Sequence, residues 1–233
     1  MRILAVLLSI LLFAGCRTVC VNGTGPATRV PLVVPAFTGI EAEGALEVRV
    51  SPGPGQAVEV EGQADLVGLV TTEVRKGIWH ITTSDCYSTD QPFVVHISIP
   101  RIDHITVSGS GNVTADSVFG AGRTLLAVHG SGDLIAHEVH EERLIASVQG
   151  SGNITVTGTA DRFDAEVQGS GDLMGRALSA AHAEVAVQGS GDVEFTAVEQ
   201  LNASVQGSGS VRYRGQPKVS SRIEGSGTVA PIE

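Results

Sequence analysis

The tripeptide Gly-Ser-Gly occurs seven times in the C-terminal half of this chain, and its regular spacing constrains the fold more than any other feature. The copies begin at residues 109, 130, 150, 169, 189, 207 and 225, so successive copies are 18 to 21 residues apart. Self-similarity at one short period indicates a repeat architecture. Glycine accounts for 29 of the 233 residues, but the glycines follow no Gly-X-Y period, which excludes collagen.

The residues that flank each copy repeat as well. Around residues 150–152, Val148 and Gln149 stand before the tripeptide, and Asn153 and Ile154 follow it. Apolar and polar residues alternate on both sides, which is typical of half-buried strands, and the two glycines permit a tight bend. The sequence therefore predicts an all-β parallel β-helix, or β-solenoid, with coils of about 18–21 residues marked by Gly-Ser-Gly bends. A β-sandwich is the alternative, but it would not require an in-register repeat.

Equivalent residues of adjacent coils stack about 4.8 Å apart in such a solenoid. The aliphatic residues then form a narrow core that needs few aromatic side chains, and only 4% of the residues are aromatic. The polar residue before the bend is a glutamine in four successive coils, which predicts an amide column. We expect this column to be a contact face for a partner if it points outward: Gln149, Gln168, Gln188 and Gln206.

The domain organisation follows from where the repeat begins. Residues 101–233 carry the Gly-Ser-Gly repeat, whereas residues 34–100 lack it but alternate well enough to predict a strand-rich N-terminal part of the same head domain. Residues 16–33 contain few apolar side chains and are predicted to be a tether.

The first residues are predicted to be a targeting signal, residues 1–15. The apolar run Ile3–Phe13 is too short to span a bilayer but suits a signal peptide. The segment 12–16, Leu-Phe-Ala-Gly-Cys, resembles a bacterial lipobox, which implies that Cys16 is acylated, with palmitate among its chains, and anchors the chain to a membrane. Arg17 follows Cys16, and by resemblance to Gram-negative lipoproteins this favours the outer membrane. An ordinary signal peptide cleaved nearby is the alternative.

Two cysteines remain, Cys20 and Cys86. An oxidising envelope compartment permits a disulfide between them, and two separate thiols are the equal alternative.

Charge and motifs exclude several kinds of function. The net charge of −10 and the absence of a basic block argue against nucleic acid as a partner. Three carboxylates that follow the bends, Asp133, Asp172 and Asp192, are weak candidates for Ca²⁺ ligands. Turn formation explains them better, since Asp side chains accept hydrogen bonds from nearby backbone amides. We expect no catalytic constellation and no cofactor.

Several segments resemble the GIN-domain family of bacterial envelope proteins, which are described as putative auto-transporter adhesin heads. The resemblance lies in residues 37–41, residues 44–50, residues 66–79 and the repeated Gly-Ser-Gly-Asn/Asp units. It covers roughly residues 34–230. It implies a right-handed β-helical body and a role on the cell envelope, and it brings no catalytic residues.

These observations together predict a non-enzymatic, lipid-anchored envelope protein, an adhesin or other binding or structural module. Its expected location is the outer membrane, facing the periplasm or the outside, and its expected ligand is a glycan or a protein surface. An envelope enzyme that acts on polysaccharide is one alternative. A self-assembling scaffold, and so a homo-oligomer, is another, because an uncapped last coil near Thr228 and Val229 offers an edge for strand pairing.

Overall fold

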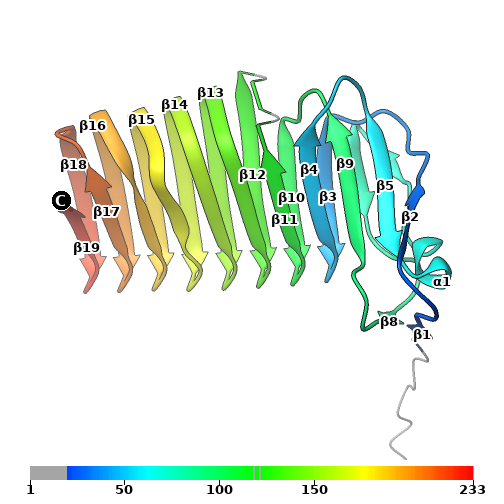
Figure 1. Cartoon of the computed structure of the whole chain (residues 1–233). Coiled ribbons are helices and arrows are strands. Elements are labelled where there is room, and N and C mark those ends of the chain that lie inside the picture. Colours follow the sequence, from blue (N-terminus) through cyan, green and yellow to red (C-terminus); the bar gives the residue numbers. More distant parts are fainter. Residues whose placement is uncertain (1–19, 118, 121, 233) are drawn as a thin grey trace, which may run out of the picture.

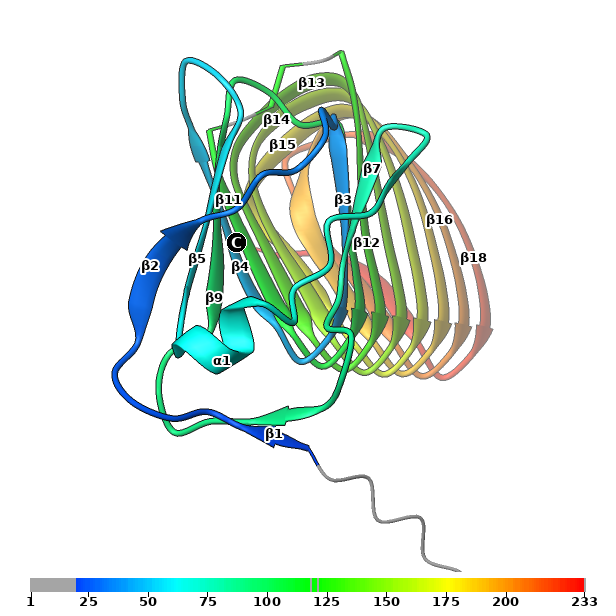
Figure 2. The ribbon, with the colours of Figure 1, turned by 90° about the vertical axis from the view of Figure 1, so that its right-hand side faces the viewer.

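The structure is a computed structural model that describes residues 20–117, 119–120 and 122–232. Its strands stack side by side along one axis, and the C-terminal residues lie at the end opposite to strand β1 (Figure 1). The view along this axis shows one coil behind another around a common interior (Figure 2). Within the described residues the one α-helix is α1, Ala64–Val67. The predicted all-β solenoid is confirmed.

Each coil has two walls that meet at the tight turn. The first wall ends at the first glycine of the turn, and its short strands are β3 (Gly39–Gly44), β10 (His104–Gly109), β12 (Arg123–Gly130) and β18 (Lys218–Gly225). The second wall starts just after the turn, and its short strands are β4 (Glu47–Pro52), β11 (Asn112–Asp116), β17 (Ser210–Arg214) and β19 (Thr228–Pro231).

Four long strands run along the second wall, around a wide bend, and into the first wall of the next coil. They are β13 (Asp133–Gly150), β14 (Asn153–Gly169), β15 (Leu173–Gly189) and β16 (Asp192–Gly207). They pair in parallel, so that equivalent repeat residues face each other, as in the pairing of Gln149 with Gln168. The period in the sequence is therefore the period of the stack.

The tight turn explains why both of its ends are glycine. The amides of Ser151 and Gly152 both donate to the carbonyl oxygen of Gly130 in the preceding coil, each at 2.9 Å. Gly150 has a φ of +124°, and a Cβ there would collide with that same carbonyl oxygen. Only glycine combines this backbone conformation with so close an approach. The same geometry recurs at each Gly-Ser-Gly.

The small polar residue after each turn ties neighbouring coils together. The Oδ1 atom of Asp133 accepts a hydrogen bond from the amide of Asn153 at 3.1 Å, and Asn153 in turn accepts from the amide of Asp172 at 3.0 Å. The column continues through Asp192 to the amide of Ser210, at 2.9 Å for both steps. Side-chain oxygens thus supply acceptors for backbone amides where the chain leaves the turn.

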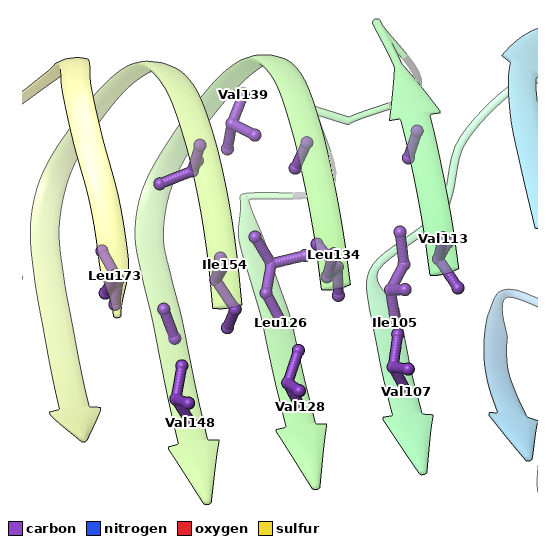
Figure 3. Close-up of a cluster of buried hydrophobic side chains, with 14 of the residues drawn as sticks. Ile105, Val107, Val113, Leu126, Val128, Leu134, Val139, Val148, Ile154 and Leu173 are labelled. Carbon is purple, nitrogen blue, oxygen red and sulfur yellow. The ribbon is translucent and has the colours of Figure 1, made fainter. Parts of the chain in front are cut away.

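Aliphatic side chains from both walls meet in the interior and form the core. The first wall contributes the buried column that contains Val107, Val128 and Val148, and the second wall contributes the column of Val113, Leu134 and Ile154 (Figure 3). The two phenylalanines of the repeat region that lie in this core, Phe163 and Phe195, pack edge to face with ring centroids 5.3 Å apart. Burial of these repeated columns is what holds coils together that could not be stable singly.

The coils differ in length, and the wide bend absorbs the difference. The parallel register between β13 and β14 shifts between Ala136 and Val139, and Glu138 there has a positive φ of 55°. The next pairs of strands shift in the same region, for example between Gly175 and Ser179. The tight turn and the first wall consequently stay in register throughout.

The stack begins before the repeat is visible in the sequence. Gly44 pairs with Gly109 and has a positive φ of 82°, so it takes the position of the first turn glycine. The turn there reads Gly-Ala-Leu instead of Gly-Ser-Gly. Strands β3 and β4 therefore already form a coil within the segment 34–100.

Antiparallel strands close the N-terminal end. Strand β9 (Val94–Ile99) pairs in parallel with β4 but antiparallel with β5 (Ala57–Gly62), and β5 pairs antiparallel with β2 (Thr28–Pro31). Beside β3, strand β7 (Ile78–Ile81) forms a hairpin with β6 (Val74–Arg75). These strands cap the core, and the side chains of Leu66 and Trp79 are fully buried beneath them.

The segment predicted to be a tether is attached to this cap where the structure describes it. Cys20 and Cys86 form a disulfide, and β1 (Val21–Asn22) pairs in parallel with β8 (Tyr87–Ser88). The hydroxyl of Thr24 donates to Asp65 at 2.8 Å. Covalent and polar contacts thus hold residues 20–31, a segment that has too few apolar side chains to bury. The predicted signal peptide (1–15) and Cys16 lie outside the described residues.

Candidate functional site: the outer face of the first wall

The outward side chains of the first wall form four parallel columns across strands β12 to β16 and β18, and we call this surface the ladder face. Because the strands are in register, every column follows the axis of the solenoid. The outer columns contain mainly cations and amides, and the inner ones contain small, acidic and aliphatic side chains. In order along the strands, the columns are Arg123, Arg143, Arg162, His182, Gln200 and Lys218; Leu125, Ile145, Asp164, Glu184, Asn202 and Ser220; Ala127, Ser147, Glu166, Ala186, Ser204 and Arg222; and His129, Gln149, Gln168, Gln188, Gln206 and Glu224.

The predicted glutamine column is the last of these, and it points outward. Gln149, Gln188 and Gln206 are exposed, and Gln168 is half-buried. Two of them make hydrogen bonds that differ from those of an amide column: Gln168 donates to Glu166 at 2.6 Å, and Gln206 donates to Glu224 at 3.4 Å. A carboxylate of the neighbouring column, Glu166, and one at the end of this column, Glu224, thus take the amide donors, since charged acceptors make the stronger bonds.

The first column was missed by the sequence analysis, although a signal for it exists. From the second Gly-Ser-Gly onward, a cation or amide stands six residues before the residue that precedes the turn, as Arg143 does before Gln149 and Arg162 before Gln168. Because the residue type varies along this column, no single residue repeats there as glutamine does in the last column. Only the register of the strands places Arg123, Arg143, Arg162 and His182 in one line.

Ion pairs connect the first and second columns. Asp164 contacts Arg143 at 2.6 Å and Arg162 at 3.1 Å, and Arg162 reaches Glu184 of the next coil at 3.2 Å. The hydrogen bond to Asp164 raises the pKa of Arg162, with further contributions from the charge of Asp164 and from Glu184. These contacts hold long side chains across successive coils and leave the middle of the face to small residues.

The small side chains in the middle leave the ladder face hollowed. A hollow of about 430 Å³ lies over Ile145, Ser147 and Ala186, with Arg143 and Glu184 at its borders. Two neighbouring hollows, of about 320 and 290 Å³, extend toward β16 and β18, and Glu184 lines all three. A fourth, of about 370 Å³, lies near Arg123 and Leu125. The three that share Glu184 form one shallow trough along the axis, between the cation column and the glutamine column.

The weak Ca²⁺ candidates lie on the second wall, just after the turn. The Oδ1 atoms of Asp133, Asp172 and Asp192 accept backbone amides of the next coil, and Asp192 also contacts Arg212 at 2.9 Å. Over the residues that the structure describes, no group of three metal-ligating side chains includes any of them.

One group of side chains has the composition of a metal site, and the sequence analysis did not identify it. Glu41, Glu43 and His80 place one ligand atom each within 4.8 Å of one another at the N-terminal end of the first wall. The Nδ1 atom of His80 lies 3.4 Å from Glu41 and 3.5 Å from Glu43. The hydroxyl of Ser108 donates to the other oxygen of Glu41 at 3.1 Å. One imidazole and two carboxylates are a ligand set suited to a divalent cation such as Zn²⁺.

The fold and this surface define the chain as a capped β-solenoid protein with one polar, hollowed face. Residues 36–217 match the model of the family described as "Putative auto-transporter adhesin, head GIN domain". The chain belongs to this family, which confirms the resemblance seen in the sequence.

Solved structures share the fold. A putative adhesin from Bacteroides fragilis is 22% identical, with a TM-score of 0.80, over 91% of this chain and 100% of that chain. A putative adhesin from Parabacteroides distasonis is 24% identical, with a TM-score of 0.71, over 91% and 99%. A putative lipid binding protein from the same organism is 22% identical, with a TM-score of 0.72 and the same coverage. The comparison with curated proteins gives no match. Among the described residues, no helix has the length and apolar character needed to cross a membrane.

Proposed function

We propose that this protein is a non-enzymatic adhesin head that binds a polysaccharide along the trough of the ladder face. The trough carries this proposal because polar groups line it in successive coils: a glutamine borders it in each of the strands β13 to β16, and charged side chains such as Arg162, Asp164 and Glu184 lie along it. Coils repeat about every 4.8 Å. A surface that repeats its donors and acceptors along a line suits a polymer that repeats its hydroxyl groups along a line.

The composition of the face favours a glycan over a folded protein. Hot spots of protein interfaces centre on buried tryptophan, tyrosine and arginine anchors. The ladder-face columns contain no aromatic residue other than the histidines, and their central residues, such as Ser147, Ala186 and Ser204, are small. Polar groups that are already held by neighbours, such as Arg162 between Asp164 and Glu184, lose little freedom on binding.

The absence of an enzymatic role is part of the proposal. Glycosidases use a pair of carboxyl groups, one of which must be protonated while the other is ionised. On the ladder face Arg162 contacts both Asp164 and Glu184, so these two side chains are held as its ion-pair partners. Their oxygen atoms are suited to accept hydrogen bonds from hydroxyl groups.

Filling the trough is expected to weaken glycan binding. Ala186→Trp places an indole over the hollow at Ser147 and Ala186, so we expect affinity for the glycan to fall by roughly tenfold or more, as for the loss of a central contact. Replacing Gln149, Gln168, Gln188 and Gln206 together by Ala is expected to weaken binding and leave the fold intact. The measurement is binding of the purified protein to an array of bacterial and host glycans, followed by titration of the best ligand.

The matched control for this prediction is Ala177→Trp. Ala177 is exposed on the wide bend, away from the trough, so the same change in side chain should leave affinity unaltered. Equal affinity of Ala186→Trp and the unmodified protein would exclude the trough as the binding surface. Turnover of an arrayed glycan would favour the enzyme instead.

We further propose that Cys16 is acylated and anchors the head to the outer membrane. The support is the lipobox-like segment that ends at Cys16 and its position four residues before the disulfide at Cys20. Cells grown with a palmitate analogue should incorporate the label into the protein, and Cys16→Ala should incorporate none. Cys20→Ala is the control and should keep the label; label retained by Cys16→Ala would contradict the anchor. Protease treatment of intact cells then separates surface display from a periplasmic location.

A further inference from the structure

The two ends of the solenoid differ. Antiparallel strands β2, β5 and β9 close the N-terminal end, whereas β18 is the last first-wall strand and pairs with β16 on one side only. All eight residues of β18 are exposed. Val219 and Ile223, which continue the buried columns of Leu201 and Val205, are 38% and 43% exposed. An open edge with apolar side chains is a template for pairing with another strand.

The sequence of β18, Lys-Val-Ser-Ser-Arg-Ile-Glu-Gly, is complementary to itself when read in the opposite direction. In an antiparallel pair centred on Ser221, Lys218 lies opposite Glu224 of a second copy, and Val219 lies opposite Ile223 of that copy. Residues that face each other across an antiparallel pair point to the same side of the sheet. This register therefore places Val219 and Ile223 of both copies on the core side, and Lys218 and Glu224 of both on the outer side.

The neighbouring registers are unfavourable. If one strand slips by one residue relative to the other, the apolar residues of one copy lie opposite residues on the polar side of the second copy. A slip by two residues restores the faces but pairs like charges. In one direction Lys218 lies opposite Arg222 of the second copy, and in the other direction Arg222 lies opposite Arg222 of the second copy. Like charges directly opposite destabilise a pair. One register alone satisfies both the faces and the charges.

We propose that two copies of this protein pair head to head through β18, in the antiparallel register centred on Ser221. The two-fold axis then lies normal to the first wall, so that the two ladder faces join on one side of a continuous sheet. The two N-terminal ends point in opposite directions. If the N-terminal anchor proposed above is present, paired heads connect two membranes, while the pairing itself depends neither on the anchor nor on the glycan.

Disulfide trapping in the full-length chain tests the pairing. In the proposed register the two Ser221 residues face each other with Cα atoms about 4.5–5.5 Å apart, within the range that a disulfide bridges. Cells that produce Ser221→Cys should therefore contain a covalent dimer on non-reducing gels. Ser226→Cys, an exposed serine of the turn just beyond the strand, is the control and should give roughly tenfold less dimer at equal protein level.

Charge reversal tests the register. In the Ser221→Cys background, Lys218→Glu places two like-charge pairs across the axis and should lower the dimer by roughly threefold to tenfold. Adding Glu224→Lys restores opposite charges and should restore the dimer. Equal trapping of Ser221→Cys and Ser226→Cys, or failure of the double reversal to recover the dimer, would overturn the proposal. Glycan binding by the Ala186→Trp variant is measured separately, so failure of one proposal is distinguishable from failure of the other.

Discussion

Gly150→Ala is expected to lower the free energy of unfolding by about 4 kcal/mol, since a left-handed conformation and a collision with backbone each cost about 1–3 kcal/mol. Gly150 has a φ of +124°, and its added Cβ would meet the carbonyl oxygen of Gly130, which already accepts two amides. Neither partner can move without breaking the stack. In a chain of this size we expect the midpoint of thermal unfolding to fall by roughly 8–16 °C.

The control for Gly150→Ala makes the same chemical change where the backbone permits it. Gly68 has a φ of −67° and no heavy atom within 4 Å of a Cβ built on it. Gly68→Ala should therefore be neutral or should stabilise the protein by about 0.4–1 kcal/mol, because it restricts the unfolded chain. Similar unfolding temperatures for the two variants would show that the tight turn is not the constraint we describe.

Loss of the disulfide is expected to have an effect of similar size. Cys20 and Cys86 are 66 residues apart, and closing a loop of that length lowers the free energy of the folded state relative to the unfolded one by about 4 kcal/mol in the chain-entropy model. The variant Cys20→Ser with Cys86→Ser should therefore unfold at a lower denaturant concentration than the oxidised protein.

Hydrogen exchange locates this effect. The amides of Val21 and Gly23 donate to carbonyl oxygens of Cys86 and Ser88, both at 2.9 Å, and should lose protection in the double variant. Amides of the central coils, such as Ser170 at the tight turn, should keep theirs. The unmodified protein treated with a reductant is the control and should behave like the variant. A double variant as stable as the oxidised protein would show that Thr24, Asp65 and β2 suffice to hold the segment.

The sequence predicts the repeating coils well because each structural requirement of a coil is met by the same type of residue at the equivalent position of every repeat. Gly150 and Gly152 are required by the backbone, and Val148 and Ile154 by the core, so these residue types recur at every coil. The coil of β3 and β4 escapes detection, since Gly-Ala-Leu satisfies the turn at residues 44–46 without its motif.

The cap and the trough were less accessible to sequence analysis. Strand β2 ends at Pro31, which argues against a central strand, but proline is tolerated where its nitrogen faces away from the partner on an edge. The trough depends on the sizes of side chains that are about 20 residues apart, such as Ser147 and Ala186, and on the ion pairs that hold Arg143 and Arg162 aside. The sequence pattern predicts the column of glutamines at the border of the trough, whereas the depth appears only when the coils are stacked.

The wide bend has a consequence for how such a head changes over generations. Since the register shifts are confined to the bend, as between Ala136 and Val139, a codon gained or lost there alters one corner and leaves the ladder face aligned. A gain or loss in the first wall instead moves every apolar side chain of that strand to the opposite face. Length variation within the lineage should therefore accumulate at the bend, while the trough is free to diversify by substitution alone.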